Sequence, residues 1–493
     1  MPGVYGGDDI SAIVLDIGSS STRAGWAGED TPRALIPTNY GWLPTEQEEE
    51  QGDDDVQMEG VETNEKNQEE ARETNGETVN GTSTNGTTTT TTTKKAISDW
   101  EKQKQKAESR KRFVGDAGVN VWRANMEIGN PLEDGILTSP ASALALARYS
   151  LDDVLGCDAR EHPLLLTEPS WNSKEAREEL TQFAFEGLGV PAFYLANSTV
   201  LSSFSAGKPT SLIVDIGASQ SSAIPVVDGF ILRKGIQRQA GLGGDCISRA
   251  LLYDLTTAAP ANSHRQGGLV DIIPHYLVKS KAPTVAGAKP PTKLREERIE
   301  NTTDSFKQFQ TMRILHEAKE TLAQILEEPW NEQQAAARPL RSFEFPDGFN
   351  DNYGIERFRA PEVLFTPQIF EGLGDVLPPT ASGQQSHRSI IDLIMSAIES
   401  TDVDSRAALL QNIVCVGGSS MIQGFNDRLS YELGLKLPGQ KVKIHSPGNV
   451  IERKFSSWLG GSILASLGTF HQLWISKQEY DEHGPNIVHT RCR

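Results

Sequence analysis

A duplicated strand–turn motif constrains the fold of this 493-residue chain more than any other feature of its sequence. The segment 13–23, IVLDIGSSSTR, recurs 199 residues later at 212–222 as LIVDIGASQSS. Each copy is an apolar strand pattern followed by Asp, Gly and a hydroxyl-rich turn, and a further strand pattern follows each turn. Because a repeated segment indicates a repeated structural unit, the motif predicts two lobes built on the same plan.

The residues at each turn suit phosphate binding. Gly18 and Gly217 let the backbone approach a ligand closely, so that successive N–H groups can converge on phosphate oxygens. The serine hydroxyls add hydrogen-bond donors, and Arg23 adds a positively charged guanidinium group. Asp16 or Asp215 could hold a hydrated Mg²⁺. Ordinary β-turns use the same residues, so one such hairpin is weak evidence for phosphate binding. Two matched copies favour a phosphate site between the lobes.

A third element points to the same chemistry. The buried-strand pattern Asn412–Val416 ends in the turn GGSSM, at 417–421. Paired glycines after a strand allow a nucleoside to lie against the backbone at a helix start, although a tight strand-to-helix turn has the same pattern. The order of hairpin, hairpin and strand–Gly–Gly favours a nucleotide cleft.

The formal net charge of −19, from 47 Lys and Arg against 66 Asp and Glu, is concentrated in one segment. Residues 46–77 hold 14 acidic and two basic residues, which leaves a net charge of −7 for the rest of the chain. Together with the Thr/Asn/Gly repeats that follow, segment 46–93 cannot bury enough apolar surface to fold, and we expect it to be disordered. The mildly acidic remainder argues against an ordinary basic nucleic-acid-binding domain.

A basic stretch, 94–112, completes this insert with eight basic and three acidic residues. For its densest part, Lys102–Arg112, two interpretations remain: a solvated helix face, or a nuclear-import or phosphate-contacting patch. A second irregular stretch, 258–303, is rich in proline and glycine and predicts a long surface loop. We expect a helix at Phe306–Leu326, and the roughly 380 residues outside the inserts alternate strand and helix signals, which is typical of an α/β fold.

Membrane and secretory classes are not expected from this sequence. No run of 18 apolar residues exists, and the N-terminal segment lacks the charge and cleavage pattern of a secretory signal. The cysteines are far apart and form no metal-binding spacing, so we interpret them as free thiols in a reducing compartment.

Several stretches resemble the actin superfamily, and within it actin and its relatives. The strongest are IERKFSSWLGGSILASLGTF at 451–470 and WISKQEYDEHGP at 474–485. ERFRAPEVLF at 356–365 and TPRA at 31–34 are also similar. The resemblance covers nearly everything outside the two inserts, and its departures are most similar to those of the nuclear, fungal-type actin-related branch.

The resemblance implies an actin-like α/β fold with two duplicated lobes around a nucleotide cleft. The first lobe would comprise 1–205 and 456–493, with 46–112 as its low-complexity, disordered acidic insert. The second would comprise 206–455, with 258–303 as a loop insert.

Carried over residue by residue, the resemblance implies ATP and Mg²⁺ as cofactors. The family's phosphate contacts fall on Ser19, Ser20, Ser21, Arg23, Ala218, Ser219 and Gln220. Its adenosine contacts fall on Gly243, His316, Lys319, Glu320, Gly417, Gly418, Ser419, Met421, Ile422 and Lys454. Asp16 and Asp215 match the carboxylates that organise the hydrated metal, while Arg23 replaces the usual Lys, which keeps the charge but changes the geometry.

Hydrolysis is not expected to be efficient. Where the family orients its attacking water with Gln and His and carries a further Asp, this sequence has Ser198, Ser222 and Ala218. A serine without a partner is a poor base, and only a one-residue shift in register would bring Asn197 to the site. We therefore expect a structural, ATP-binding protein with no catalytic residues, although slow hydrolysis remains open.

The disordered insert interrupts the region where an actin grips the next filament subunit, and its negative charge would repel other copies. We therefore expect no self-polymerisation. The resemblance instead implies a nuclear scaffold subunit of chromatin-remodelling and histone-acetyltransferase complexes, paired with an actin monomer on a helicase–SANT-associated helix. Segments 461–470 and 144–155 would border the docking groove or be plain core. Histone contact is a further expectation, for which a solubilising spacer is an equal explanation.

Two other functions stay open at this point. A filament-forming actin-type ATPase is disfavoured by the interrupted loop and by the missing water-positioning residues. A small-molecule kinase of the same superfold needs a carboxylate base near the second hairpin, and Ser222 and Ala218 offer none.

Overall fold

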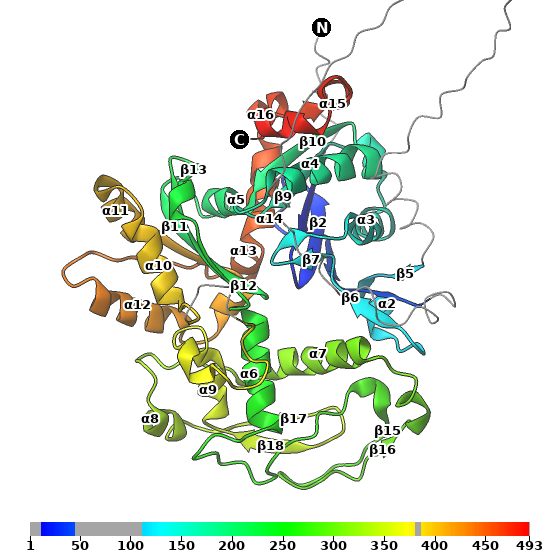
Figure 1. Cartoon of the computed structure of the whole chain (residues 1–493), viewed down its shortest axis with the longest axis vertical. Coiled ribbons are helices and arrows are strands. Elements are labelled where there is room, and N and C mark those ends of the chain that lie inside the picture. Colours follow the sequence, from blue (N-terminus) through cyan, green and yellow to red (C-terminus); the bar gives the residue numbers. More distant parts are fainter. Residues whose placement is uncertain (1–10, 45–110, 380–385, 493) are drawn as a thin grey trace, which may run out of the picture.

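Two β-sheets, one in each lobe, organise the chain (Figure 1). The computed structural model describes residues 11–44, 111–379 and 386–492. The first sheet has the strand order β21 (Ile475–Ser476), β10 (Ala192–Asn197), β9 (Leu164–Glu168), β1 (Ile13–Ile17), β2 (Ser21–Trp26), β3 (Ala34–Pro37). The second has the order β13 (Phe230–Ile231), β12 (Gln220–Val227), β11 (Ser211–Ile216), β19 (Ile413–Val416), β20 (Ile444–His445), and β14 (Gln237–Ala240) also pairs with β12.

The two sheets repeat one plan. In the first, β1 is antiparallel to β2 and parallel to β9. In the second, β11 is antiparallel to β12 and parallel to β19. The register is the same as well, since Asp16 faces Arg23 across the first hairpin and Asp215 faces Ser222 across the second. The predicted α/β fold with two duplicated lobes is therefore confirmed.

Helices cover the sheets of both lobes. Those of the first lobe are α3 (Pro140–Arg148), α4 (Lys174–Gln182), α5 (Ser198–Ser205), α14 (Ser456–Ser466), α15 (Lys477–His483) and α16 (Val488–Arg491), with π-helices η1 (Tyr149–Leu155) and η3 (Phe183–Leu188). Those of the second lobe are α6 (Gly244–Thr256), α7 (Asp304–Leu322), α8 (Glu332–Ala336), α9 (Glu356–Glu362), α10 (Ile390–Glu399), α11 (Val403–Leu410), α12 (Phe425–Lys436) and α13 (Val450–Lys454).

The C-terminal part of the chain returns to the first lobe. Helix α14 packs against β1 and α5, and its Trp458 is fully buried with Nε1 donating to the Val14 carbonyl at 3.1 Å. Gly460 permits this approach, because a Cβ there would lie 1.9 Å from the Leu201 carbonyl oxygen. The predicted motif at 451–470 thus packs directly on the first strand of the duplicated motif.

Small elements form the outer tip of each lobe. In the first lobe, α2 (Gly115–Asn120) lies beside the small sheet of β5 (Arg112–Phe113), β4 (Tyr40–Trp42) and β6 (Glu127–Gly129). In the second lobe, the hairpin of β15 (Val278–Ser280) and β16 (Lys293–Leu294) precedes α7. We use first-lobe tip for residues 113–130 and second-lobe tip for residues 275–306.

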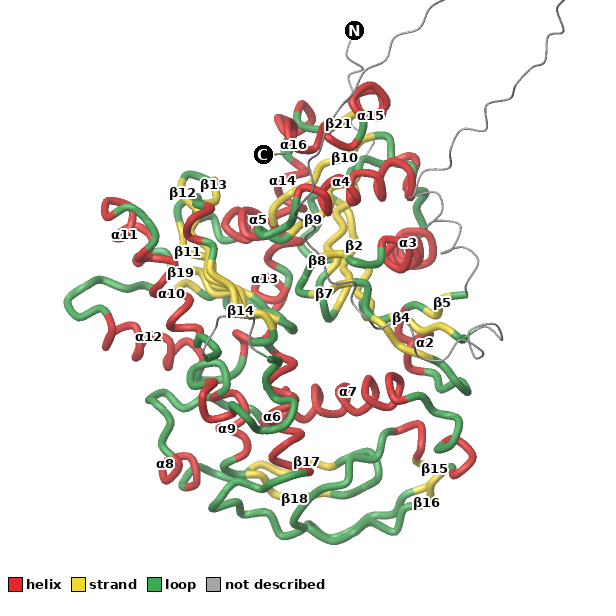
Figure 2. The backbone as a smooth tube through the Cα atoms, in the orientation of Figure 1, coloured by secondary structure: helices red, strands yellow, loops and turns green. Residues whose placement is uncertain are grey.

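The predicted inserts fall in different parts of the chain. Segment 258–303 is mostly loop, as expected, interrupted by short 3₁₀ turns and the β15–β16 hairpin (Figure 2). Of the 46–112 insert, 46–110 lies outside the described residues, so its predicted disorder stays a prediction. Arg112 already pairs with Trp42 in the β4–β5 ladder, so the segment starts and ends at neighbouring strands.

The helix expected at Phe306–Leu326 begins two residues earlier and ends four residues earlier. Thr303 caps its N-terminus, since its side chain accepts a hydrogen bond from the Phe306 amide at 3.3 Å. Ala323 is extended, and Gln324 forms a bridge with Gln423 instead of another helical turn. The apolar side chains Ile325 and Leu326 are buried all the same, which is why their spacing looked helical.

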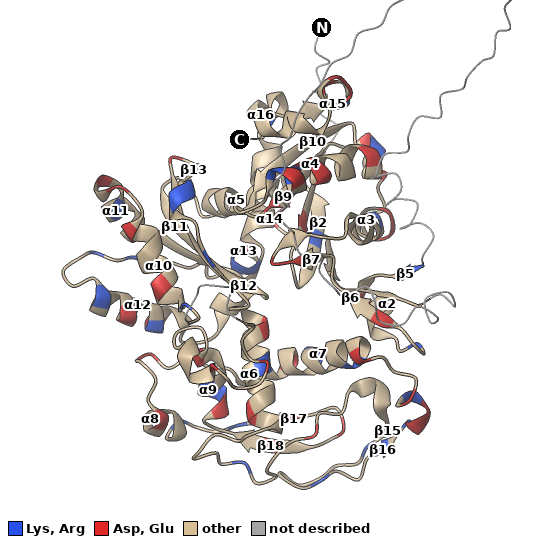
Figure 3. Cartoon of the chain, viewed as in Figure 1, with Lys and Arg blue, Asp and Glu red and all other residues tan. Residues whose placement is uncertain are grey.

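Over the described residues, acidic and basic side chains are interspersed on both lobes (Figure 3). No helix in this part of the chain is long and apolar enough to cross a membrane. The four cysteines are all free, and three of them are buried.

Candidate functional site

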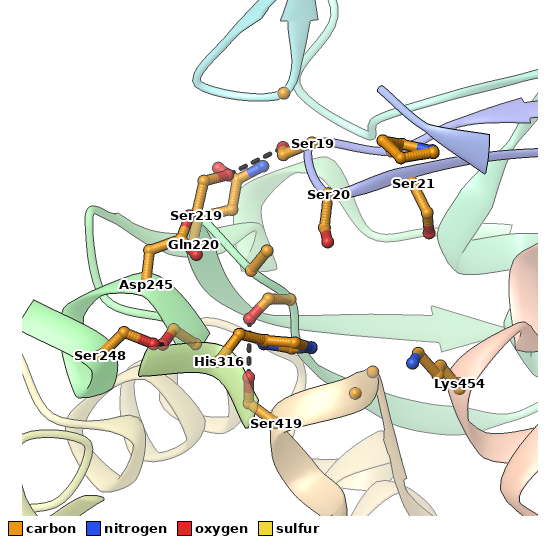
Figure 4. A pocket seen from close by; sticks show the side chains of 18 of the residues that line it. Ser19, Ser20, Ser21, Ser219, Gln220, Asp245, Ser248, His316, Ser419 and Lys454 are labelled. Carbon is orange, nitrogen blue, oxygen red and sulfur yellow. Dashed lines mark hydrogen bonds between the residues drawn. The ribbon is translucent and has the colours of Figure 1, made fainter. Parts of the chain in front are cut away.

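A cavity of about 1380 Å³ lies between the lobes and collects residues from the three predicted motifs. The two hairpin turns face each other across it, and Lys454 and His316 reach it from other elements (Figure 4). The predicted residues that line it are Asp16, Ser19, Ser20, Ser21, Arg23, Asp215, Ala218, Ser219, Gln220, His316, Lys319, Glu320, Gly417, Gly418, Ser419, Met421, Ile422 and Lys454. Sequence reasoning therefore brought together a set that shares one surface in space.

The two turns have the same backbone geometry. The Gly18 amide donates to the Ser21 carbonyl at 3.1 Å, and the Gly217 amide donates to the Gln220 carbonyl at 3.0 Å. Across the cavity the Ser19 and Ser219 hydroxyls form a hydrogen bond of 2.9 Å (Figure 4). This bond links the lobes at the level of the turns.

The first carboxylate is fully engaged by protein groups. Arg23 Nη1 donates to Asp16 Oδ2 at 2.6 Å, and Ser457 Oγ donates to the same oxygen at 2.9 Å. Thr167 Oγ1 donates to Asp16 Oδ1 at 2.6 Å. The Asp16 side chain is only 7% exposed, so this is a buried ion pair with added hydrogen bonds.

Arg23 is held in this position by two further groups. Its Nη2 donates to the Ser21 hydroxyl at 3.1 Å, and its guanidinium lies 5.1 Å from the Phe455 ring centroid. Arg23 thus faces the cavity as part of a network with Asp16, while Nε is buried without a hydrogen-bond partner.

The second carboxylate has a different environment. Burial raises the pKa of Asp215 to about 6, with Arg23 lowering it and Asp16 raising it. Among the described residues, no side chain makes a hydrogen bond or ion pair to Asp215, because Ser222 occupies the position opposite it that Arg23 has in the first hairpin. Asp215 is therefore the carboxylate whose oxygens remain free for a hydrated cation.

The strand–Gly–Gly turn fits closely against the second hairpin. Gly417 has φ of +89°, and a Cβ there would lie 2.4 Å from Asp215 Oδ1 and from the Ile216 carbonyl oxygen. The turn continues as the 3₁₀ helix η8 (Gly418–Met421), where Ser419 Oγ donates to the Gly217 carbonyl at 3.0 Å. Only glycine allows the two motifs to meet in this way.

Helix α7 supplies the polar wall of the cavity. Lys319 is 7% exposed, its Nζ donates to the Gly244 carbonyl at 2.7 Å, and burial lowers its pKa. One turn earlier, His316 Nε2 lies 3.2 Å from Glu320 Oε1. Desolvation and the charge of Lys319 lower the pKa of His316, which favours the neutral imidazole.

Gly243 is the one predicted contact that does not line the cavity. It lies directly behind the second turn, where a Cβ would be 2.5 Å from the Ala218 carbonyl oxygen. The next residue, Gly244, lines the cavity instead. Gly243 therefore supports the turn by close packing at the start of α6.

The positions expected to lack hydrolytic groups do lie at the cavity. Ser198, Ser222 and Ala218 all line it. Asn197, proposed as a substitute after a shift in register, does not: its side chain caps α5 by accepting from the Thr199 amide at 3.0 Å, and it accepts from Ser170 Oγ at 2.8 Å. The structure therefore places Ser198, and not Asn197, at the cavity.

Glu168, which sequence reasoning missed, also lines the cavity. Arg177 Nε donates to both of its oxygens at 3.0 Å, and Asn172 Nδ2 donates to Oε2 at 3.0 Å. Burial raises the pKa of Glu168 while these partners oppose the shift. With both oxygens occupied, Glu168 is not placed to accept a proton from water.

Other lining residues were also missed. Thr167, Ser456 and Ser457 flank Asp16 from the neighbouring strand and from the start of α14, and Asp245 and Ser248 come from the first turns of α6. Ser456 and Ser457 fall inside the motif at 451–470, so their signal was present. Nothing in the sequence alone ties Asp245 or Ser248 to the cavity.

The two tips make direct contact at one end of the molecule. Trp122 Nε1 donates to Thr302 Oγ1 at 2.9 Å, the Ile128 amide donates to Ser305 Oγ at 2.9 Å, and Thr303 Oγ1 donates to the Met126 carbonyl at 2.5 Å. Met126, Tyr276 and Phe306 are buried together in a small apolar cluster. These bonds join the lobes beyond the hairpin turns.

The cavity suits a nucleotide with a hydrated cation. Its volume exceeds the roughly 300–1,000 Å³ of ordinary ligand pockets. It offers backbone turns and serine donors at one side, basic groups in Arg23, Lys319 and Lys454, and a free carboxylate in Asp215. Among the described residues no group of three or more His, Cys, Asp or Glu could hold a metal, so a cation would keep most of its water.

Comparisons with known proteins agree with this geometry. Residues 7–493 match the family model described as Actin. A protein named actin-related protein 4 from Mycosarcoma maydis is 47% identical, with all of both chains aligned. Proteins of the same name are 39% identical in Emericella nidulans, over 99% of this chain and 98% of that one, and 34% identical in Arabidopsis thaliana, over 99% of this chain and all of that one.

Proposed function

Because the chain belongs to the actin family, we propose that it is a non-polymerising nuclear member that binds ATP with little or no hydrolysis and serves as a scaffold subunit of chromatin-remodelling and histone-acetyltransferase complexes. One observation carries the ATP-binding part. Two duplicated turns and a strand–Gly–Gly turn meet at one cavity, with basic side chains and the carboxylate of Asp215, which no described side chain pairs with. Fold alone does not decide between ATP and other phosphate ligands, so the proposal depends on these residues.

The roles of the residues follow from their positions. Backbone amides and hydroxyls of both turns would hold the phosphates, with Arg23 and Lys454 supplying positive charge, and the Gly417–Gly418 turn would accept the nucleoside. Mg²⁺ would neutralise phosphate charge when bound, and its water shell would be oriented chiefly by Asp215. Asp16 would act through Arg23, which it holds in place at 2.6 Å.

Little hydrolysis is proposed because the positions where the family orients its attacking water hold Ser198, Ser222 and Ala218, and none of these side chains is a base. Ser198 and Ser222 can hold a water but cannot take up its proton alone, and the oxygens of Glu168 and Asp16 are occupied. Ser222 lies opposite Asp215, but no hydrogen bond joins the two among the described residues. An intact nucleotide would then act structurally, since a ligand at about 1,000 times its dissociation constant stabilises the folded state by about 4 kcal/mol.

The assembly part of the proposal draws support from two surfaces. The predicted charged insert starts and ends at the neighbouring strands β4 and β5, beside the first-lobe tip, where it would keep other copies away. At the junction of the lobes, α5 contacts both β13 and α14 (Figure 1) and carries Phe204, which is 42% exposed. Phe230 on β13 and Leu467 after α14 are also exposed, and we propose that these apolar side chains, on elements that α5 contacts or follows, receive a partner helix.

For segment 144–155, the buried leucines fit the second interpretation, plain core packing. Leu144, Leu146 and Leu151 of segment 144–155 are buried in the core of the first lobe, since α3 and η1 pack on its sheet. Their side chains are unavailable to a partner. We therefore place the proposed helix against α5, β13 and the end of α14.

The experiment is co-purification of the full chain with an actin monomer and a helicase–SANT-associated scaffold helix, followed by extraction of bound nucleotide. We expect a stable ternary assembly that contains ATP. A matched variant pair sharpens the test: Phe204→Ser should weaken helix binding, whereas Leu435→Ser, an exposed position on α12, should not.

Two outcomes would contradict the proposal. Sedimentation of long filaments by the isolated chain under filament-promoting salt and nucleotide would show polymerisation. Equal helix binding by both variants and the unmodified chain would remove the proposed docking surface.

A further inference from the structure

A second cavity, of about 410 Å³, lies where the two tips meet. Asn120 and Trp122 line it from the first-lobe tip and its helix α2, whereas His275, Arg298, Gln310 and Arg313 line it from the second-lobe tip and α7. Its volume is in the range of small-molecule sites. It is separate from the cavity between the hairpin turns, although Arg313 contributes to both.

The charge of this cavity is one-sided. Two arginines and a histidine line it, and no carboxylate does. Within the described ranges neither Arg298 nor Arg313 forms an ion pair. Arg298 Nη1 donates to the Tyr276 carbonyl at 2.9 Å and its guanidinium lies 4.8 Å from the Trp122 ring centroid, so it is fixed in position without its charge being neutralised.

Arg313 is also held by a buried group. Its Nη1 donates to Gln310 Oε1 at 3.1 Å, and Gln310, only 4% exposed, donates through Nε2 to the Val119 carbonyl at 3.3 Å. This pair connects α7 with α2 across the lobes. Two fixed and unneutralised guanidinium groups around one cavity are suited to a phosphate-type anion.

Asn120 favours a ligand that carries a hydrogen-bond donor. Its Oδ1 is buried without a hydrogen-bond partner, while its Nδ2 donates to the exposed Asp116 carboxylate at 3.5 Å. That carboxylate fixes the orientation of the amide, because the reverse orientation would set two acceptors against each other. A buried acceptor without a partner is costly, so a ligand that donates a hydrogen bond here would be favoured.

We propose that this second cavity binds a phosphate-bearing anion with at least one hydrogen-bond donor, such as hydrogen phosphate or a hydroxyl-bearing phosphate ester. The anion contacts Arg298 and Arg313, and its donor meets Asn120 Oδ1. Since these groups come from both tips, the bound anion also joins the lobes. In the ATP-bound protein that follows from the proposed function, it slows release of the nucleotide.

The test compares binding of inorganic phosphate and sulfate by calorimetry to the full chain, with the main cavity first saturated with ATP and Mg²⁺. The two anions are similar in size, but only phosphate carries a proton to donate at neutral pH. We expect phosphate to bind more tightly, and Asn120→Ala to remove most of that preference. Equal affinities for the two anions in the unmodified chain would overturn the proposal.

Arg298→Gln is the diagnostic variant, because Arg298 lines only the second cavity. We expect it to weaken phosphate binding by at least about tenfold. Lys293→Gln removes the same charge from an exposed position on β16 and should leave binding unchanged. Similar losses in both variants would show a non-specific effect of charge, and thermal unfolding of both checks that Arg298→Gln folds.

The proposal can also be separated from the ATP proposal. If the chain retains no ATP, the same titration compares Arg298→Gln with Lys454→Gln, which lies at the main cavity. Loss of phosphate binding in Arg298→Gln alone supports the second site even then. Loss in Lys454→Gln alone assigns the anion to the main cavity and overturns this inference.

Discussion

The two hairpins of the duplicated motif share one backbone geometry but differ in their electrostatic environments. Gly18 and Gly217 make matching turn hydrogen bonds, and Asp16 and Asp215 occupy equivalent positions. Yet Asp16 is paired with Arg23, whereas Asp215 faces Ser222 and its pKa rises to about 6. The two turns therefore share one backbone geometry, while a single cross-strand position, Arg23 in the first hairpin and Ser222 in the second, decides whether the opposite carboxylate is paired.

The largest effect is expected at the ion pair of the first hairpin. Arg23→Gln leaves Asp16 charged, buried and close to Asp215, so the free energy of unfolding should fall by about 3–5 kcal/mol. Urea denaturation of the nucleotide-free protein measures it. Arg33→Gln is the control, because the Arg33–Glu29 pair is largely exposed and should contribute at most about 1 kcal/mol. Equal losses would show that the Asp16–Arg23 pair is not special.

The two carboxylates should respond in opposite directions to the same change. Asp215→Asn removes a buried charge without a partner and should stabilise the nucleotide-free protein by about 1–3 kcal/mol above pH 6. Asp16→Asn leaves Arg23 unpaired and should destabilise it. Denaturation of both variants in parallel measures this, and the same sign in both would break the comparison between the hairpins.

The pH dependence of stability should carry the signature of Asp215. Its pKa is raised in the folded state, so its contribution is present below about pH 4 and is lost as the pH rises through about 6. Across that window the unmodified protein should lose up to about 1.4 kcal/mol per pH unit relative to Asp215→Asn. Burial raises the pKa of Asp254 to about 7 as well, but both proteins share that effect. Parallel stability curves from pH 4 to 7 would rule out the assigned environment of Asp215.

The smallest effect is expected where the two turns touch. Ser19→Ala removes the 2.9 Å bond to Ser219 and should cost about 0.5–1.5 kcal/mol. A double-mutant cycle with Ser219→Ala isolates the coupling between the hairpins. Ser466→Ala, which loses an exposed bond to a backbone carbonyl, is the control and should change stability less. No coupling between Ser19 and Ser219 would mean that the lobes are not joined at the turns.

The fold and most of the residues that line the main cavity could be predicted from the sequence. The repeated motif predicted the two lobes, the motif at 451–470 predicted the family, and both are confirmed by the topology and by the comparisons. The apolar strands and glycine turns carry this information locally. The apolar pattern also placed the end of α7 too late, because Ile325 and Leu326 are buried although they lie outside the helix.

What the sequence could not supply depends on contacts between distant segments. The pairing of Asp16 with Arg23 follows from the strand register, which pattern alone leaves undetermined. The bonds of Thr302 and Thr303 to the first-lobe tip arise in a segment that reads as surface loop, because its composition says nothing about what lies opposite. The second cavity also forms between segments that are distant in the sequence, so no local pattern predicts it.

One measurement tests the central claim most directly: the fate of γ-labelled ATP in a single loading of the purified full chain with Mg²⁺. We expect one nucleotide bound per chain, with its γ-phosphate still attached after several hours, and weaker Mg²⁺-dependent retention in Asp215→Asn. Release of labelled phosphate at a rate comparable with filament-forming actin, or no retained nucleotide, would contradict the assignment of an intact ATP between the two unequal hairpins.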